Sequence, residues 1–281
     1  MVDFRYTFCM RDTLVIDLET KKAFAEVGGE RNVAELGISV AGVYSYAKDA
    51  FFAYEEHELP RLAEMLKETD HIIGFNIIHF DIPVLAPYVE KNLLAPIAVT
   101  DIFADAVAFL GHRVGLDGVA RATLGEKKSG HGLEALEWFR QGRMEEVKKY
   151  CLDDVRLTRD LYEYGKKNGH ILFESFADGN THSIPVDWTG KKQVPVAGVL
   201  AAAFASRRRV AIEYISSQDS DKLGFRKSRL VDIYAIKNNG DIEGYCHLRQ
   251  AVRKFNLRRI MKAEATDESY LIPQDVQPAL L

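Results

Sequence analysis

Two acidic residues stand one residue apart at the end of an apolar run near the start of the chain. The Leu-Val-Ile run at residues 14–16 leads into Asp17 and Glu19 and predicts a buried strand. Because side chains alternate along a strand, Asp17 and Glu19 are expected to point to the same side. Paired carboxylates on a buried strand repel each other and lose hydration, and a divalent cation with oxygen ligands would offset both costs. A strand that ends in a solvated turn is the alternative interpretation of this pattern alone.

A third acidic residue lies where a strand is expected to pass into a helix. The apolar segment 71–75 is followed by Asn76, Phe80 and Asp81, and Asp81 opens a segment with helical spacing. The alternative interpretation of Asp81 is a helix N-cap.

A fourth acidic residue lies in a long segment with helical spacing, residues 143–166. Tyr150 and Asp154 are four residues apart and therefore share a helix face. Asp153 is displaced from Asp154 by about 100° around the helix, so we expect Asp153 to be solvated. Asp101 and Asp105 are expected to lie at the start of another helix and to stabilise it, because negative charge is favourable there.

In chain order, Asp17-x-Glu19, Asn76-x-x-x-Phe80-Asp81 and Tyr150-x-x-x-Asp154 resemble the three motifs of the DEDD superfamily of 3′–5′ exonucleases. The Tyr-x-x-x-Asp form of the third motif resembles the DEDDy branch. The resemblance covers about residues 10–170 and implies a ribonuclease H-like fold, a mixed sheet flanked by helices.

The resemblance also implies two divalent metal ions, Mg2+ or Mn2+, which clamp the attacking and leaving oxygens of a phosphodiester from about 3.5–4 Å apart. Asp17 is expected to bridge both ions, Glu19 and Asp154 to hold the ion beside the attacking water, and Asp81 the ion near the leaving oxygen. Tyr150 is expected to orient that water, because a phenol with a pKa of about 10 is a poor base at neutral pH. Expected substrate contacts are Leu18, Thr20, Asn76 and Phe80. Turn formation and core packing explain the last two equally well.

The charge is unevenly distributed along the chain. Residues 193–265 hold 14 Lys and Arg against 7 Asp and Glu, a net +7, so the rest of the chain carries −4 − 7 = −11. Arginines interleaved with aromatic residues suit anionic ligands that can stack. The alternative is a basic solvated face.

This basic stretch resembles a WYL domain, a small Sm/SH3-like β-barrel, over about residues 195–265. Where the family has Trp-Tyr-Leu, this chain has Gly240-Asp241-Ile242. The family is thought to bind nucleic acid or nucleotide-like effectors. Carried onto this chain, the candidate binding residues are Tyr214, Arg229, His247, Arg249, Arg253 and Arg258.

The pattern of apolar residues predicts an α/β chain with two domains. We expect a ribonuclease H-like domain over 1–172, a linker over 173–192 and a β-barrel domain over 193–281. In the first domain the expected loop is 21–32, the expected strands are 34–41, 44–54 and 71–75, and the expected helices are 58–69, 81–91, 102–110, 116–124, 133–140 and 143–166. In the second, the expected helix is 196–206 and the expected strands are 210–215, 228–237, 241–248 and 252–256. Asn239-Gly240 predicts a tight hairpin turn.

The composition is that of an ordinary globular chain, 47% hydrophobic and 28% charged. No apolar run is long enough for a membrane span, no signal-peptide pattern is present, and the three cysteines lack metal-site spacing, so we expect a cytoplasmic protein without membrane partners.

The function expected from these features is metal-dependent 3′–5′ exonuclease activity on DNA or RNA. The expected partners are single-stranded 3′ ends, a nucleotide-like effector at the basic domain, and a helicase or other nucleic-acid-processing protein. The alternative is a non-catalytic sensor of nucleic acid or ligand, or a recruited subunit, on a nuclease scaffold.

Overall fold

The computed structural model describes residues 11–126, 132–175, 179–189, 196–216, 225–238 and 240–273, with the backbone alone at residues 132 and 133. The chain divides into two compact units, Met1–Glu163 and Tyr164–Leu281. None of the helices within the described ranges is long and apolar enough to span a bilayer.

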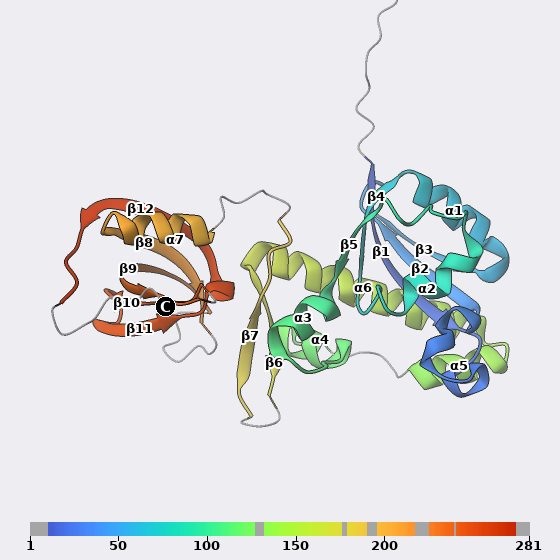
Figure 1. Ribbon diagram of the computed structural model, residues 1–281. Coiled ribbons are helices and arrows are strands. Elements are labelled where there is room, and N and C mark those ends of the chain that lie inside the picture. The colour runs from blue at the N-terminus through green and yellow to red at the C-terminus, as the bar shows by residue number, and fades with distance from the viewer. Residues whose placement is uncertain are drawn as a thin grey trace, which may run out of the picture. The chain divides into compact units, whose positions relative to one another are not determined.

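The first unit is built on a mixed five-stranded sheet of order β3-β2-β1-β4-β5 (Figure 1). Its strands are β1 (Asp12–Thr20), β2 (Ile38–Ser45), β3 (Ala50–Glu55), β4 (Thr69–Gly74) and β5 (Ala98–Asp101). β1, β2 and β3 are antiparallel neighbours, whereas β4 and β5 continue the sheet parallel to β1. β1 therefore lies at the centre, where both of its edges are paired.

Helices cover both faces of this sheet. They are α1 (Leu59–Lys67), α2 (Asp81–Leu85), α3 (Ile102–Leu110), α4 (Leu116–Leu124), α5 (Gly132–Arg140) and α6 (Met144–Asn168). The helix predicted over 81–91 ends at Leu85 and is followed by a 3-10 turn, Ala86–Tyr88. Pro87 explains the early end, because it lacks an N–H and its ring would clash with the carbonyl of residue 83. The loop predicted over 21–32 contains the 3-10 helix Phe24–Val27. A second 3-10 helix, Glu30–Glu35, extends past this loop into the strand predicted over 34–41, so β2 begins later than expected, at Ile38.

The two faces of the sheet are filled differently. Ala41 and Val43 of β2 belong to the core beneath α1, whereas Val40 packs with Val147 and Cys151 of α6. Gly42 pairs with Asp17 of β1 and shares the α6 face. A Cβ on Gly42 would lie 2.8 Å from Cys151 Sγ and 3.0 Å from a Val155 methyl, so the glycine permits the close approach of α6.

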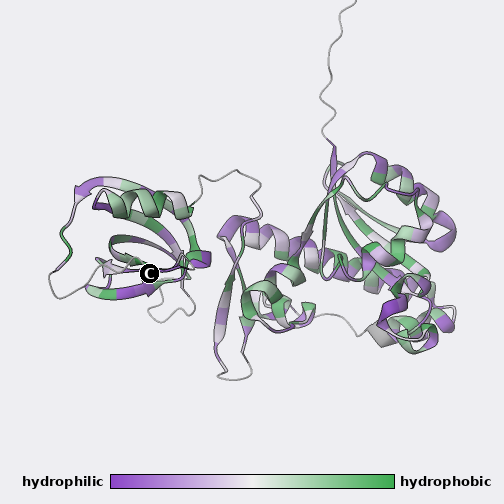
Figure 2. Cartoon of the chain, viewed as in Figure 1, coloured by the Kyte–Doolittle hydropathy of each residue, from purple (hydrophilic) through white to green (hydrophobic). Residues whose placement is uncertain are grey.

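The second unit contains the end of α6, a hairpin of β6 (His170–Glu174) and β7 (Thr181–Pro185), the helix α7 (Val196–Ala205) and a separate antiparallel sheet. The predicted linker 173–192 thus includes the strand β7. Its polar Thr-His-Ser sequence does not indicate a strand, because β7 pairs with β6 through backbone hydrogen bonds. α7 is hydrophobic along most of its length (Figure 2) and packs Leu200 and Phe204 into the core.

The antiparallel sheet has the order β11-β10-β9-β8-β12. Its strands are β8 (Arg208–Ile215), β9 (Arg226–Ile236), β10 (Ile242–Cys246), β11 (Ala251–Phe255) and β12 (Ile260–Ser269). Within the described residues, the two edge strands β11 and β12 do not pair with each other, so the sheet does not close and the predicted barrel is wrong. β9 and β10 are antiparallel, but Asn239 of the predicted turn lies outside the described residues. The strand β12 is not predicted by the sequence pattern, because most of this edge strand is polar and exposed.

The close approach at Gly42 makes a prediction about stability. Gly42→Ala should lower the free energy of unfolding by about 1–3 kcal/mol, because the added methyl group overpacks the β2–α6 contact. Chemical denaturation followed by circular dichroism measures the change.

Gly118→Ala is the matched control, since a Cβ at this position in α4 meets nothing within 4 Å. It should stabilise the chain by roughly 0.5–1 kcal/mol through helix propensity. Equal stability of Gly42→Ala and the wild type would contradict the role given to Gly42.

Candidate active site

The first acidic pair occupies the centre of the sheet. Asp17 and Glu19 lie on β1 and pair with Gly42 and Val40, so both face α6 as the strand pattern predicts. Both are half-buried. The register shifts after Glu19, so the regular pairing of β1 with β2 ends beside the pair.

α6 brings the last acidic residue of the motifs to the same place. Asp154 is 2% exposed, and one carboxylate oxygen from each of Asp17, Glu19 and Asp154 lies within 4.8 Å of the others. All three donors are oxygen atoms, the ligands that Mg2+ and Mn2+ favour. The cluster therefore fits a hard divalent cation.

Cys151 fixes how α6 meets β1. Its Sγ lies 3.3 Å from the backbone oxygen of Asp17 and 3.6 Å from Asp17 Oδ2. Burial raises the pKa of the Cys151 thiol well above its ordinary value, and the charges of Asp17, Glu19 and Asp154 raise it further. The thiol is therefore a neutral donor. This contact was not predicted. The available signal was that Cys151 stands three residues before Asp154, which places both on one helix face.

Tyr150 lies one helical turn before Asp154 and is 2% exposed. Its ring makes an edge-to-face contact with Trp138 of α5, with the centroids 6.0 Å apart. Arg143 in turn lies over the Trp138 ring at 5.8 Å. These contacts hold the phenol in one orientation on the helix that carries Asp154.

Asp81 approaches the cluster from α2. It is 4% exposed, and its Oδ1 accepts the backbone N–H of Leu18 at 2.9 Å. Burial raises the pKa of Asp81 to about 7, the Leu18 N–H opposes this shift, and the charges of Asp101 and Asp154 add to it. Among the described residues, Asp81 is not a member of the group within 4.8 Å. It is a neighbour whose pKa is raised in part by the charge of Asp154.

Asp101 holds the loop between β4 and α2. Its Oδ1 accepts the backbone N–H groups of Asn76 at 2.9 Å and Ala104 at 3.1 Å, and its Oδ2 that of Ile78 at 3.0 Å. The predicted role at a helix start is confirmed, since Asp101 caps α3. Its second role, in shaping the loop before Asp81, depends on a pairing of β4 with β5 that the sequence does not reveal.

The predicted substrate-contact residues lie around the acidic cluster in different environments. Asn76 has φ 68°, a left-handed turn conformation that asparagine tolerates. Phe80 packs against the core and against Phe24, with ring centroids 6.0 Å apart. Leu18 is buried and its N–H is used by Asp81, whereas the Thr20 hydroxyl donates to the Lys22 carbonyl at 3.0 Å.

In the second unit, the structure brings the predicted binding residues Tyr214 and Arg229 together. The guanidinium of Arg229 lies 5.7 Å from the Tyr214 ring centroid, and its Nη2 donates to Ser216 Oγ at 3.2 Å. Arg229 is 7% exposed. Its hydrogen-bond partners among the described residues are Cys246 Sγ and Ser216 Oγ, and neither is a carboxylate. Among the described residues, it is therefore a buried cation that contacts neutral groups.

The other predicted residues of this unit differ in burial and in the partners that can be named. His247 Nε2 lies 2.9 Å from Asp232 Oδ2, and Asp232 also accepts Arg209 Nε at 2.7 Å. Arg249 is half-buried, while Arg253 and Arg258 are exposed.

Arg259 was not predicted as a site residue, yet it joins β6–β7 to the antiparallel sheet. It donates to Ser183 Oγ at 3.1 Å and to the Ile215 carbonyl at 3.2 Å, and burial lowers its pKa. Its neighbours from distant strands could not be read from spacing.

The raised pKa of Asp81 makes a prediction about pH dependence. Since the folded-state pKa lies above the ordinary 3.8, Asp81 contributes fully to stability below about pH 4, and this contribution is lost as the pH rises through 7. In EDTA, the free energy of unfolding of the wild type should fall between pH 5 and 8. In Asp81→Asn this fall should be smaller by roughly 2–4 kcal/mol. Denaturant titrations across this range measure it.

Asp153→Asn is the matched control on α6 and should keep the wild-type pH dependence. The same slope in Asp81→Asn and the wild type would refute the assignment to Asp81.

Comparison with known proteins identifies a domain family in the second part of the chain. Residues 195–265 match the family model of the WYL domain. No curated protein matches the chain. A solved structure with similarity is the family B DNA polymerase from the hyperthermophilic archaeon Pyrobaculum calidifontis, with a TM-score of 0.44 and 20% identity over 55% of this chain and 24% of the polymerase. The predicted WYL domain at residues 195–265 is confirmed.

Proposed function

We propose that the first unit is a metal-dependent 3′–5′ exonuclease of the DEDDy type with a ribonuclease H-like fold, acting on single-stranded 3′ ends of DNA or RNA. The observation that carries this proposal is the convergence of Asp17, Glu19 and Asp154 from β1 and α6, with oxygens within 4.8 Å. Asp81 borders the cluster through Leu18. The strand order supports the fold, since three antiparallel strands are continued by two parallel ones.

Two divalent ions, Mg2+ or Mn2+, belong to this proposal. Asp17, Glu19 and Asp154 would hold one ion, and Asp81 together with Asp17 would hold the second. The fit rests on the oxygen-only donor set and on burial that makes the unneutralised carboxylates unfavourable. Bound ions would neutralise the phosphodiester and lower the pKa of the attacking water.

The chain's own residues would bind and orient the substrate and the water. The Tyr150 hydroxyl would hold the attacking water by a hydrogen bond, in an orientation fixed by Trp138. Leu18 would act through its N–H, which keeps Asp81 directed at the cluster. Thr20, Asn76 and Phe80 would contact the terminal nucleotide. The products would be nucleoside monophosphates.

The WYL domain would supply attraction for the nucleic acid or bind a nucleotide-like effector. Its exposed arginines suit phosphates, and the buried Arg229 beside Tyr214 suits an anion with an aromatic ring. A helicase or similar partner would deliver single-stranded ends. The second candidate function, a non-catalytic sensor, is favoured by the same WYL domain, and the two functions differ in metal-dependent turnover.

A gel assay with labelled oligonucleotides separates these functions. With 5′-labelled single-stranded DNA or RNA and Mn2+ or Mg2+, the wild type should give a ladder that shortens from the 3′ end, and EDTA should abolish it. Asp17→Asn and Asp154→Asn should lose at least about 100-fold in rate, because each removes a charged ligand. Tyr150→Phe should lose less, since only the orientation of water is affected.

Asp105→Asn is the matched control, because this carboxylate belongs to the first turn of α3 rather than to the cluster. Binding without any ladder on either polymer, in wild type and variants alike, would reject the exonuclease and favour the sensor.

The exposed edge strand β11 gives a test of the basic domain. Arg253 and Lys254 are exposed on β11, whereas Arg226 is paired with Glu213. Arg253→Gln/Lys254→Gln should weaken binding of a fluorescent oligonucleotide. The slope of log K against log salt should fall by about 0.7 for each phosphate that the variant no longer neutralises.

Arg226→Gln should leave the slope unchanged, because its charge is already compensated. If both variants bind with the wild-type slope, β11 does not hold the nucleic acid.

A further inference from the structure

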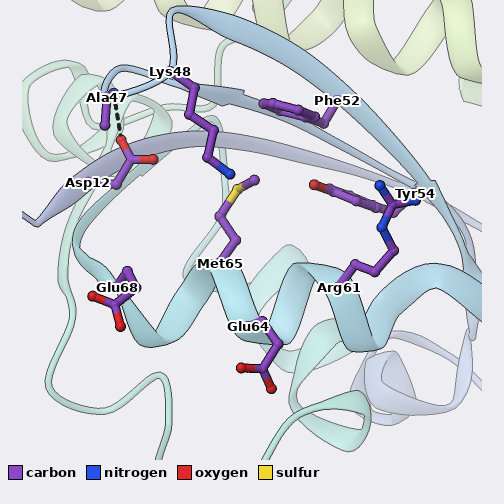
Figure 3. Close-up of a pocket in the computed structure, with 9 residues that line it drawn as sticks. All are labelled: Asp12, Ala47, Lys48, Phe52, Tyr54, Arg61, Glu64, Met65 and Glu68. Atoms are coloured by element: carbon purple, nitrogen blue, oxygen red, sulfur yellow. Dashed lines mark hydrogen bonds between the residues drawn. The ribbon is translucent and has the colours of Figure 1, made fainter.

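A cavity of about 440 Å³ opens between β3 and α1 in the first unit (Figure 3). Phe52 and Tyr54 form one wall and pair with Val43 and Ala41 of β2. These two partners flank Gly42, which faces α6 and the carboxylates. Because side chains alternate along a strand, the cavity lies on the opposite face of the sheet from the candidate active site.

The wall is aromatic, and each ring is accompanied by a cation. The rings of Phe52 and Tyr54 are nearly parallel, at 10°, with centroids 6.2 Å apart. Lys48 Nζ lies 5.4 Å from the Phe52 centroid, and the Arg61 guanidinium lies 5.6 Å from that of Tyr54. Met65 closes the base beside the Lys48 ammonium group (Figure 3). An aromatic ligand with an anionic group matches these walls.

The cavity is lined by three carboxylates, Asp12, Glu64 and the exposed Glu68, and by two cations, Lys48 and Arg61. Asp12 accepts hydrogen bonds from the Ala47 N–H and the Ser45 hydroxyl, and Glu64 is paired with Lys67 at 2.8 Å. Arg61 is paired with Glu58 at 2.8 Å. In the part of the chain that the structure describes, no carboxylate lies within ion-pair distance of Lys48. Lys48 is therefore the lining cation whose charge a ligand can use.

We propose that this cavity binds a nucleoside monophosphate. The base would stack on the half-buried Phe52, beside Tyr54, which is 4% exposed, while Lys48 would leave the Phe52 face to meet the phosphate. A volume of about 440 Å³ lies in the range of small-molecule sites and suits one nucleotide. The inference does not depend on activity at the carboxylates, although the proposed exonuclease would release this class of ligand.

The test uses the full chain in EDTA with 13C-methyl methionine, so that divalent ions cannot recruit phosphate to the carboxylates. Met65 lines the cavity, whereas Met144 packs beside Val40 and Cys151 on the other face. Titration with AMP should shift the Met65 methyl resonance and leave that of Met144 in place. Adenosine should bind more weakly than AMP, and inorganic phosphate should not reproduce the Met65 shift. A shift at Met144 alone, no shift at Met65 with AMP, GMP, CMP or UMP, or equal affinity for adenosine and AMP would overturn the proposal.

Lys48→Met tests the phosphate contact, and its exposed position makes a folding defect easy to separate by thermal melting. The dissociation constant for AMP should rise about tenfold, as expected when one charge-assisted hydrogen bond is removed. Lys91→Met, at an exposed lysine outside the cavity, should bind like the wild type. Equal affinities of the two variants would also overturn the proposal.

Discussion

Mutual repulsion among buried carboxylates is the constraint on which the first unit depends. Asp81 and Asp154 are almost inaccessible to solvent, and burial together with neighbouring charge raises the pKa of Asp81 to about 7. Such a cluster persists only where the surrounding structure holds it. The paired central strand β1, the glycine that admits α6, and the Leu18 N–H bonded to Asp81 supply that support.

Alternation along the strands separates this charged region from the rest of the core. On the α1 face, Leu14, Ile16 and Val43 are apolar and buried, and Asp12 lies at the start of β1 beside the cavity. The α6 face includes Asp17, Glu19 and Gly42. At the edge strand β3 the α1 face is less completely filled, and the aromatic cavity with Lys48 and Arg61 lies there. A single sheet therefore holds an acidic cluster on one face and an aromatic cavity on the other, without direct contact between them.

Local patterns predicted the elements of the site better than their connections. The helix of Tyr150 and Asp154 and the strand of Asp17 and Glu19 follow from periodicity, which is a property of neighbouring residues. The contact of Cys151 with Asp17 and the loop bonds of Asp101 depend on which strands and helices become neighbours, and no short window contains that information. The same reason accounts for the strand within the predicted linker, the missed polar edge strand β12, and the unclosed β11–β12 sheet.

The basic domain shows why counting charges along the sequence overstates what a ligand can use. Arg209 and His247 share Asp232, and Arg226 is paired with Glu213, so these side chains contribute little to the attraction of a polyanion. The net positive charge of the stretch therefore acts mainly through exposed residues such as Arg253. Arg229 is the opposite case. Its burial beside Tyr214 reduces the screening of its charge by water, and the same burial means that only a small ligand could reach it. In the proposed function, attraction of a polymer would therefore depend on exposed arginines, and binding of an effector on the buried Arg229.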